Sequence, residues 1–164
     1  MAEISLTDGL GRITFDSSTI EGLEISYAGP AMIYIKSNQT AFASIGLEYL
    51  GIEELYAGND LKGKGLRHFL RLVRNLDASK GTSDWTYAGM DAKGRFAKGA
   101  NWIMGQMEWH YALMNKDGSE AVCAFCRIDD DHVCSAVSIL REGDDTKISK
   151  MVNLIKSIQA RKDQ

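Results

Sequence analysis

Three observations predict an α+β fold, in which an antiparallel β-sheet meander packs with helices. Short segments near the start alternate polar and apolar residues, as half-buried strands do. Apolar residues at spacings of three and four then form one face of a helix before residue 77. Between residues 85 and 140, extended segments are separated by turns rich in Asp, Asn and Gly. No linker or repeat interrupts residues 1–164, so a single domain is predicted.

The first half of the chain is predicted to open with strands. Segments 12–15, 23–27 and 32–35 are extended by pattern, and Gly29-Pro30 marks a turn between the last two. Segment 42–55 fits two structures. One set of its apolar residues suits a strand face, namely Ala43, Ile45, Leu47 and Tyr49, and another suits a loose helix, namely Leu47, Leu50 and Leu55.

A helix is predicted to follow, with Asn59 or Asp60 accepting the free backbone N–H groups of its first turn. Its core face is expected to hold Leu66, Phe69, Leu70, Val73 and Leu76. Four strands of an antiparallel meander come next, predicted over 85–90, 95–114, 120–128 and 132–140. The turns between them are expected at Asp91–Gly94, Asn115–Gly118 and Asp129–Asp131, because Asn, Asp and Gly tolerate positive φ.

The chain is predicted to end in a helix capped by Asp144, Asp145 or Thr146. The apolar stripe of this helix is long enough to dock on the sheet and consists of Ile148, Met151, Val152, Ile155 and Ile158. The basic Lys156, Arg161 and Lys162 lie towards the C-terminal end of the helix, where the helix dipole is negative. Two striped helices and one sheet imply packed layers, with one helix expected on each face of the sheet.

The composition and net charge argue against two classes of protein, general nucleic-acid-binding proteins and membrane-spanning proteins. Lys and Arg number 19 against 22 Asp and Glu, a formal charge of -3, which argues against general nucleic-acid binding. The apolar runs are only a few residues long, so no membrane span is expected. No signal-peptide pattern follows Met1, which predicts a cytoplasmic protein with reduced cysteines; a processed secreted form stays open.

The C-terminal part of the chain is predicted to contain a strand over 132–140, the acidic Asp144-Asp145, and a helix that reads ISKMVNLIKSI from Ile148 to Ile158. This pattern resembles the ending of Mog1/PsbP-like proteins. The resemblance covers the last quarter of the chain, and the order of early strands, helix and meander fits the same fold. It implies an α/β/α sandwich and, by analogy with the fold, a binding or accessory role. It implies no particular functional residue.

A cluster of Cys123, Cys126, His132 and Cys134 allows several interpretations. Three thiols and an imidazole could bind zinc. In a strand, however, Cys123 and Cys126 point to opposite faces, so we predict buried free thiols and no metal. A turn at 128–132 could also set Cys126 opposite Cys134, close enough for a disulfide. Alternatively, Cys126 or Cys134 with His132 could form the reactive pair of a small enzyme.

Four basic residues recur on one side of the predicted helix. Lys64, Arg67, Arg71 and Arg74 follow at intervals of three, four and three residues, with His68 beside them. Residues at those spacings stack on one helix face. That face is either an ordinary solvated surface or a site for an anion or an acidic segment. Arg favours the second, because its planar fork pairs with carboxylates and phosphates. These four residues are the predicted partner-binding site.

Two further features have simple explanations. The Asp129–Asp131 run lacks the spacing of a calcium loop, so a solvated turn is predicted. Many aromatic and methionine side chains lie in the predicted meander, and they form either the core or a hydrophobic groove on the side that bears Trp102. They are Trp85, Tyr87, Trp102, Met104, Met107, Trp109, Tyr111 and Met114.

The sequence therefore predicts a non-enzymatic binding or accessory protein without a cofactor. Its expected partner is a protein with an acidic surface, as for an adaptor, a secretion chaperone or an immunity protein. The competing hypothesis is the small enzyme that uses Cys126 or Cys134 with His132.

Overall fold

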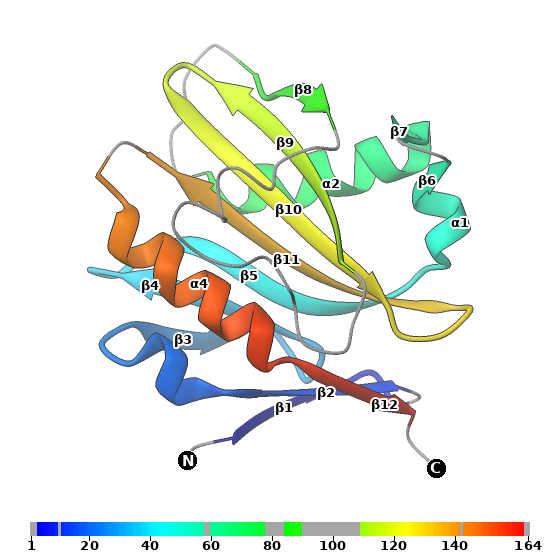
Figure 1. The fold of residues 1–164 in the computed structure, drawn as a ribbon, viewed down its shortest axis with the longest axis horizontal. Coiled ribbons are helices and arrows are strands. Elements are labelled where there is room, and N and C mark those ends of the chain that lie inside the picture. The colour runs from blue at the N-terminus through cyan, green and yellow to red at the C-terminus, as the bar shows by residue number, and fades with distance from the viewer. Residues whose placement is uncertain are drawn as a thin grey trace.

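The larger of two main sheets forms the centre of the molecule (Figure 1). The computed structural model describes residues 3–9, 11–57, 60–77, 84–89, 109–141 and 143–162. Within these ranges the larger sheet has seven antiparallel strands, in the spatial order β3 (Glu24–Tyr27), β4 (Met32–Ser37), β5 (Thr40–Tyr49), β11 (His132–Leu140), β10 (Ser119–Arg127), β9 (Trp109–Lys116) and β8 (Thr86–Gly89).

The remaining elements surround this sheet. A smaller sheet has the order β1 (Glu3–Thr7), β2 (Gly11–Asp16) and β12 (Gln159–Lys162), and the 3-10 turn η1 (Ser17–Ile20) follows β2. The helices are α1 (Ile52–Leu55), α2 (Gly63–Leu76) and α4 (Asp145–Ser157), and the short strands β6 (Tyr56–Ala57) and β7 (Asp60–Leu61) pair between the first two. No helix among the described residues is long and apolar enough to cross a membrane.

The predicted meander is confirmed in order and direction, since β8, β9, β10 and β11 pair antiparallel in sequence. The β9–β10 turn is tighter than predicted: β9 runs on to Lys116, and only Asp117 and Gly118 lie between the strands. Both have positive φ, 38° and 76°, as a two-residue hairpin turn requires. The part of the long predicted strand over 95–108 lies outside the described residues.

Segment 42–55 contains both of the structures that its pattern allowed. Residues up to Tyr49 belong to β5, and α1 begins at Ile52. β5 pairs with β11, which places both strands inside the larger sheet. All nine residues of β11 are buried, because the sheet is covered on both faces at this strand.

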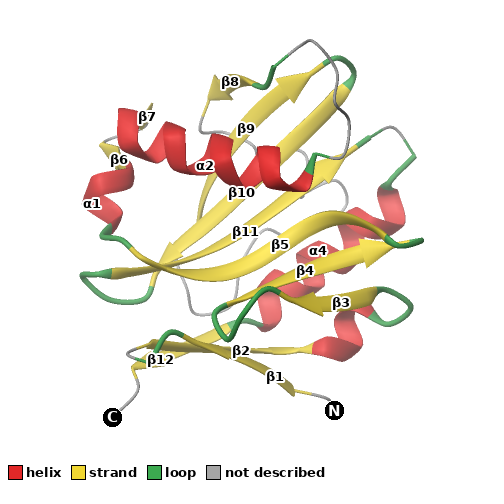
Figure 2. Ribbon diagram, turned by 180° about the vertical axis from the view of Figure 1, so that it is seen from behind, coloured by secondary structure: helices red, strands yellow, loops and turns green. Residues whose placement is uncertain are grey.

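Helices α2 and α4 cover opposite faces of the larger sheet, as Figure 2 shows from behind. Alternate residues of one strand therefore enter different cores: Cys123 and Phe125 pack in the α2 layer, and Ala124 and Cys126 pack in the α4 layer. The expected α+β layers are thus present. β1, β2 and β12 lie on the α4 side and complete that core.

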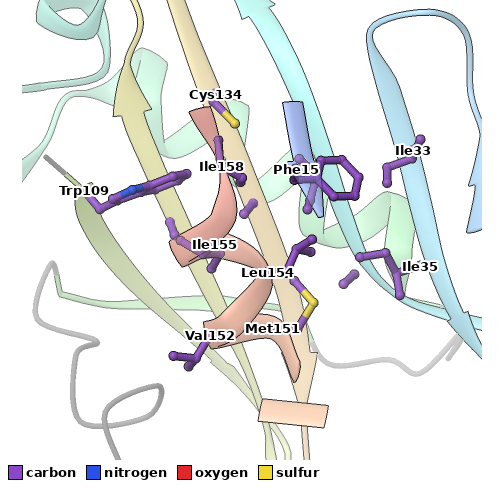
Figure 3. Packing of buried hydrophobic residues seen from close by; sticks show 14 of the residues in the cluster. Phe15, Ile33, Ile35, Trp109, Cys134, Met151, Val152, Leu154, Ile155 and Ile158 are labelled. Carbon is purple, nitrogen blue, oxygen red and sulfur yellow. The ribbon is translucent and has the colours of Figure 1, made fainter. Parts of the chain in front are cut away.

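Helix α4 is part of the core, as its stripe predicts. Met151, Leu154 and Ile155 are fully buried, and Figure 3 shows them between Trp109 of β9 and Phe15 of β2. Ile148 is only partly buried, and Leu154, which the stripe omits, takes a core position instead. The helix has Asp144 at its N-cap position and ends at Ser157. Arg161 and Lys162 were expected near its end, but they lie in β12 and pair with β2.

The predicted start of α2 is wrong, but its predicted core face is confirmed at Phe69, Val73 and Leu76, which are buried. Lys62 is the N-cap residue, and Asp60 belongs to β7 instead of capping the helix. Leu72 and His68 are buried, whereas Leu66 and Leu70 are only partly buried. The buried face is therefore rotated relative to the predicted stripe.

The buried face of α2 includes a close backbone contact at Gly65. The Gly65 backbone lies against the backbone of Leu55, and a Cβ built on Gly65 would stand 2.0 Å from the Leu55 carbonyl oxygen. Any side chain at this position would require a shift of the Leu55 backbone or of α2. Gly65 thus lies on the side of α2 that faces inward, against α1.

Candidate functional site

The four predicted basic residues lie on the outward side of α2. Lys64, Arg71 and Arg74 keep 55%, 61% and 53% of their side-chain surface exposed, and Arg67 is also exposed. The predicted face is therefore real, since α2 is helical throughout this stretch.

Three of these cations have carboxylates of the same chain within 4.0 Å, namely Lys64, Arg71 and Arg74. Lys64 Nζ lies 2.8 Å from Glu54 Oε1, and Arg74 makes two contacts with Asp84, at 2.5 and 3.2 Å. Hydrogen bonds from the basic side chains hold the pKa values of Glu54 and Asp84 below their usual values. Arg67 makes no ion pair within 4.0 Å in the described ranges. It is therefore the cation most open to a partner.

Arg67 and Arg71 line a shallow depression of about 440 Å³ between α2 and the end of β5. The β5 side contributes Glu48 and Tyr49, followed by Leu50. Tyr49 is 69% exposed, which is unusual for so large a side chain. Arg74 does not line the depression, so the structure separates it from the other three predicted residues, Lys64, Arg67 and Arg71.

At the base of the depression, Glu48 faces His68 and Arg71. Glu48 Oε1 lies 3.9 Å from His68 Nε2, and Glu48 Oε2 lies 3.9 Å from Arg71 Nη2. Arg71 Nη2 is also 3.1 Å from His68 Nδ1. Because a guanidinium group can only donate, Nδ1 accepts this bond, and a neutral His68 carries its proton on Nε2, directed towards Glu48.

The surroundings in the depression change the pKa values of both His68 and Glu48. Burial and then the Arg71 charge lower the pKa of His68 to about 4, so His68 is neutral at pH 7. Burial raises the pKa of Glu48 above its usual value, and the Arg71 charge opposes this. The His68 side chain is only 7% exposed, and its Nε2 has no hydrogen-bond partner within the described part of the chain. Such perturbed groups in a concavity are typical of functional sites.

His132 is engaged elsewhere. Its Nε2 lies 2.7 Å from Asp8 Oδ2 and its Nδ1 lies 2.9 Å from Asp129 Oδ1, and the ring is 4% exposed. These contacts join the turn after β1 to the turn after β10. The Tyr49 ring meets His132 edge-on, with centroids 5.0 Å apart. Asp129 was predicted to lie in a simple solvated turn, and its contact with His132 was not foreseen.

The cysteines have the placement predicted for buried thiols. All three are free and buried, and Cys126 pairs directly with Cys134 across the β10–β11 hairpin. Hydrogen bonding to Cys126 and burial raise the pKa of Cys134, the opposite of what a nucleophile needs. Both ring nitrogens of His132 face carboxylates. The arrangement therefore gives no support to a Cys–His catalytic pair.

No group of three or more His, Cys, Asp or Glu residues is arranged to hold a metal ion in the ranges that the structure describes. Among the large side chains of the meander, Trp85 and Trp109 are core residues on opposite sides of the sheet. Trp102, Met104 and Met107 lie outside the described residues, and so does most of the groove predicted on that side.

The comparisons with known proteins give no family. No protein-family model and no curated protein matches the chain. Among solved structures, the chain is similar to a protein from Bacteroides thetaiotaomicron VPI-5482 whose crystal structure was determined at 1.50 Å resolution. The match has a TM-score of 0.42 and 11% sequence identity, and it covers 98% of this chain. This chain spans 48% of the length of that protein.

Sequence reasoning found the basic residues but missed the groups that complete the depression. Glu48 and Tyr49 stand at the end of β5, and α1, β6 and β7 separate them from α2 in sequence. Their only sequence signal is a charged and an aromatic residue at the end of an otherwise apolar run. Contact with α2 could not be read from that signal.

Proposed function

We propose that this protein is a non-enzymatic binding or accessory protein, and that it engages an acidic segment of a protein partner at the depression between α2 and β5. The proposal depends mainly on Arg67. This residue is exposed, makes no intramolecular ion pair in the described ranges, and lines the same depression as Tyr49, which is 69% exposed. Arg and Tyr are enriched where protein surfaces bind partners.

The shape and charge of the surface support a peptide-like ligand. The depression is open and shallow, and Lys64 and Arg71 extend its positive charge on either side of Arg67. An acidic segment lying along α2 would meet cations about one helical turn apart. Arg74 is held by Asp84 and lies outside the depression, and Lys64 is held by Glu54, so we propose that both contribute less than the sequence suggests.

The resemblance to Mog1/PsbP-like proteins favours the same class of function. One helix on each face of the larger sheet is consistent with such a sandwich. Membership of that fold, like a cytoplasmic location, stays a proposal.

Binding of a blocked hexa-aspartate peptide, measured by fluorescence anisotropy at low and at physiological salt, tests the proposal. We expect the peptide to bind more weakly at higher salt, because the contacts are exposed charges. The Arg67→Glu variant should lose at least about tenfold in affinity, as expected for a reversed charge at a central contact. Arg141→Glu, which changes an exposed arginine elsewhere, is the matched control.

Three outcomes decide the matter. Salt-sensitive binding that Arg67→Glu weakens and Arg141→Glu preserves supports the proposal. Equal weakening by both variants indicates a general charge effect and contradicts the proposed site. Equal binding of a hexa-lysine peptide contradicts the proposed partner chemistry.

A further inference from the structure

The depression already contains a carboxylate of its own. Glu48 lies within 3.9 Å of both Arg71 and His68, and its side chain is 23% exposed. Glu48 therefore faces one side of the Arg71 guanidinium, the kind of group that a partner carboxylate would bind.

The distances show that Glu48 is held loosely. At 3.9 Å, neither contact is a direct hydrogen bond, in contrast to the 2.8 Å between Lys64 and Glu54 on the rim. His68 Nε2 faces Glu48 and has no hydrogen-bond partner in the described ranges. A ligand carboxylate that reached this buried Nε2 would give it a hydrogen-bond acceptor.

We propose that Glu48 is an internal counter-ion that competes with the partner for Arg71, so that a proton taken up by Glu48 strengthens binding of the acidic segment. This inference rests on the proposed function and adds its regulation. A negative Glu48 repels the incoming carboxylate and reduces the charge that Arg71 offers. A protonated Glu48 removes the repulsion and can donate a hydrogen bond to the ligand.

Among the residues that line the depression, Glu48 is the one that carries a carboxyl group. The other groups lining the depression are Tyr49 and Leu50 from the β5 side and Lys64, Arg67, His68 and Arg71 from α2. Lysine and arginine stay charged through the range from pH 5 to pH 7.5. His68 stays neutral there, because its pKa is about 4. Burial raises the pKa of Glu48, so its carboxyl takes up a proton at a higher pH than an ordinary glutamate does. The protonated form of Glu48 should therefore bind the acidic segment more tightly than the ionised form.

The experiment compares wild type with Glu48→Gln, using the blocked hexa-aspartate peptide from pH 7.5 to pH 5. Glutamine has the shape of a protonated glutamate, so this variant should bind roughly three- to tenfold more tightly than wild type at pH 7.5. Wild-type affinity should approach that of the variant as the pH falls. Calorimetry in two buffers of different ionisation enthalpy should show proton uptake on binding to wild type and none for Glu48→Gln.

Glu53→Gln is the matched control, because Glu53 is a neighbouring exposed carboxylate that faces Arg127 instead of the depression. Thermal unfolding of each variant checks that the fold is intact. Peptide binding that depends on Arg67 but is equal in wild type and Glu48→Gln overturns this inference and leaves the proposed function standing. Equal gains from Glu48→Gln and Glu53→Gln also overturn it, since they would reflect net charge alone. Absence of binding to every variant overturns the proposed function and this inference with it.

Discussion

Replacing Gly65 by alanine should destabilise the protein, although alanine is the better helix former. In an unobstructed helix interior, this change stabilises by about 0.5–1 kcal/mol. In α2, however, the new Cβ would lie 2.0 Å from the carbonyl oxygen of Leu55, and real Cβ atoms essentially never approach within 3.0 Å. The obstacle is backbone, so no side-chain rotation removes it.

The required shift has a further cost. The Leu55 carbonyl accepts a 2.7 Å hydrogen bond from Lys62 N, and the Leu55 side chain is fully buried. Overpacking of this kind costs about 1–3 kcal/mol, and the disturbed hydrogen bond adds about 0.5–1.5 kcal/mol. After subtraction of the helix preference, we expect a net loss of roughly 1–3 kcal/mol, which lowers the melting temperature of a chain of this size by several degrees.

Urea unfolding followed by circular dichroism measures the difference. Gly63→Ala is the control in the same helical turn, because a Cβ at Gly63 would meet only the flexible end of Arg67, at 3.4 Å. We expect Gly63→Ala to be neutral or slightly stabilising. A Gly65→Ala variant as stable as the Gly63→Ala variant would refute the close packing of α2 against Leu55.

Three other perturbations test separate parts of the structure. Ile155→Ala should cost roughly 2–5 kcal/mol in urea unfolding, because Ile155 is fully buried where α4 meets the sheet, and an unchanged midpoint would show that the helix is not docked. Asp77→Ala should cost about 3–5 kcal/mol, because it leaves Lys116, 2.7 Å away and 11% exposed, without its buried carboxylate; a loss below 1 kcal/mol would contradict burial of the pair. Cys126 and Cys134 should react slowly with a thiol reagent at pH 7 until urea unfolds the chain, and one fast native thiol would revive the enzyme hypothesis.

The elements that the sequence predicts best are those whose structure is determined by residues close together in the chain. The turn at Asp117 and Gly118 and the stripe of α4 each depend on residues a few positions apart. Segment 42–55 stayed ambiguous because β5 is buried on both faces from Phe42 to Leu47. Without a solvent face, a strand loses the alternation that identifies it.

The site was predictable only in part, for a related reason. The spacing of the basic residues follows from the helix, so their common face could be read directly. Their counter-charges come from other elements: Glu54 from α1, Asp84 from the segment before β8, and Glu48 from β5. Likewise, nothing local to Asp8 indicates His132 as its neighbour. Such pairings depend on the tertiary fold, which a single sequence does not specify by spacing.

The pairing of β5 with β11 has a consequence for how the chain folds. Leu47 lies opposite Cys134 at the centre of the larger sheet, so its two halves, β3-β4-β5 and β11-β10-β9-β8, join through one contact between distant parts of the chain. Closing so long a loop is entropically costly before the contact forms. Each half can form hairpins early, but neither can bury its side of the central seam alone. Folding should therefore be slow and cooperative, as in other topologies dominated by non-local strand pairs.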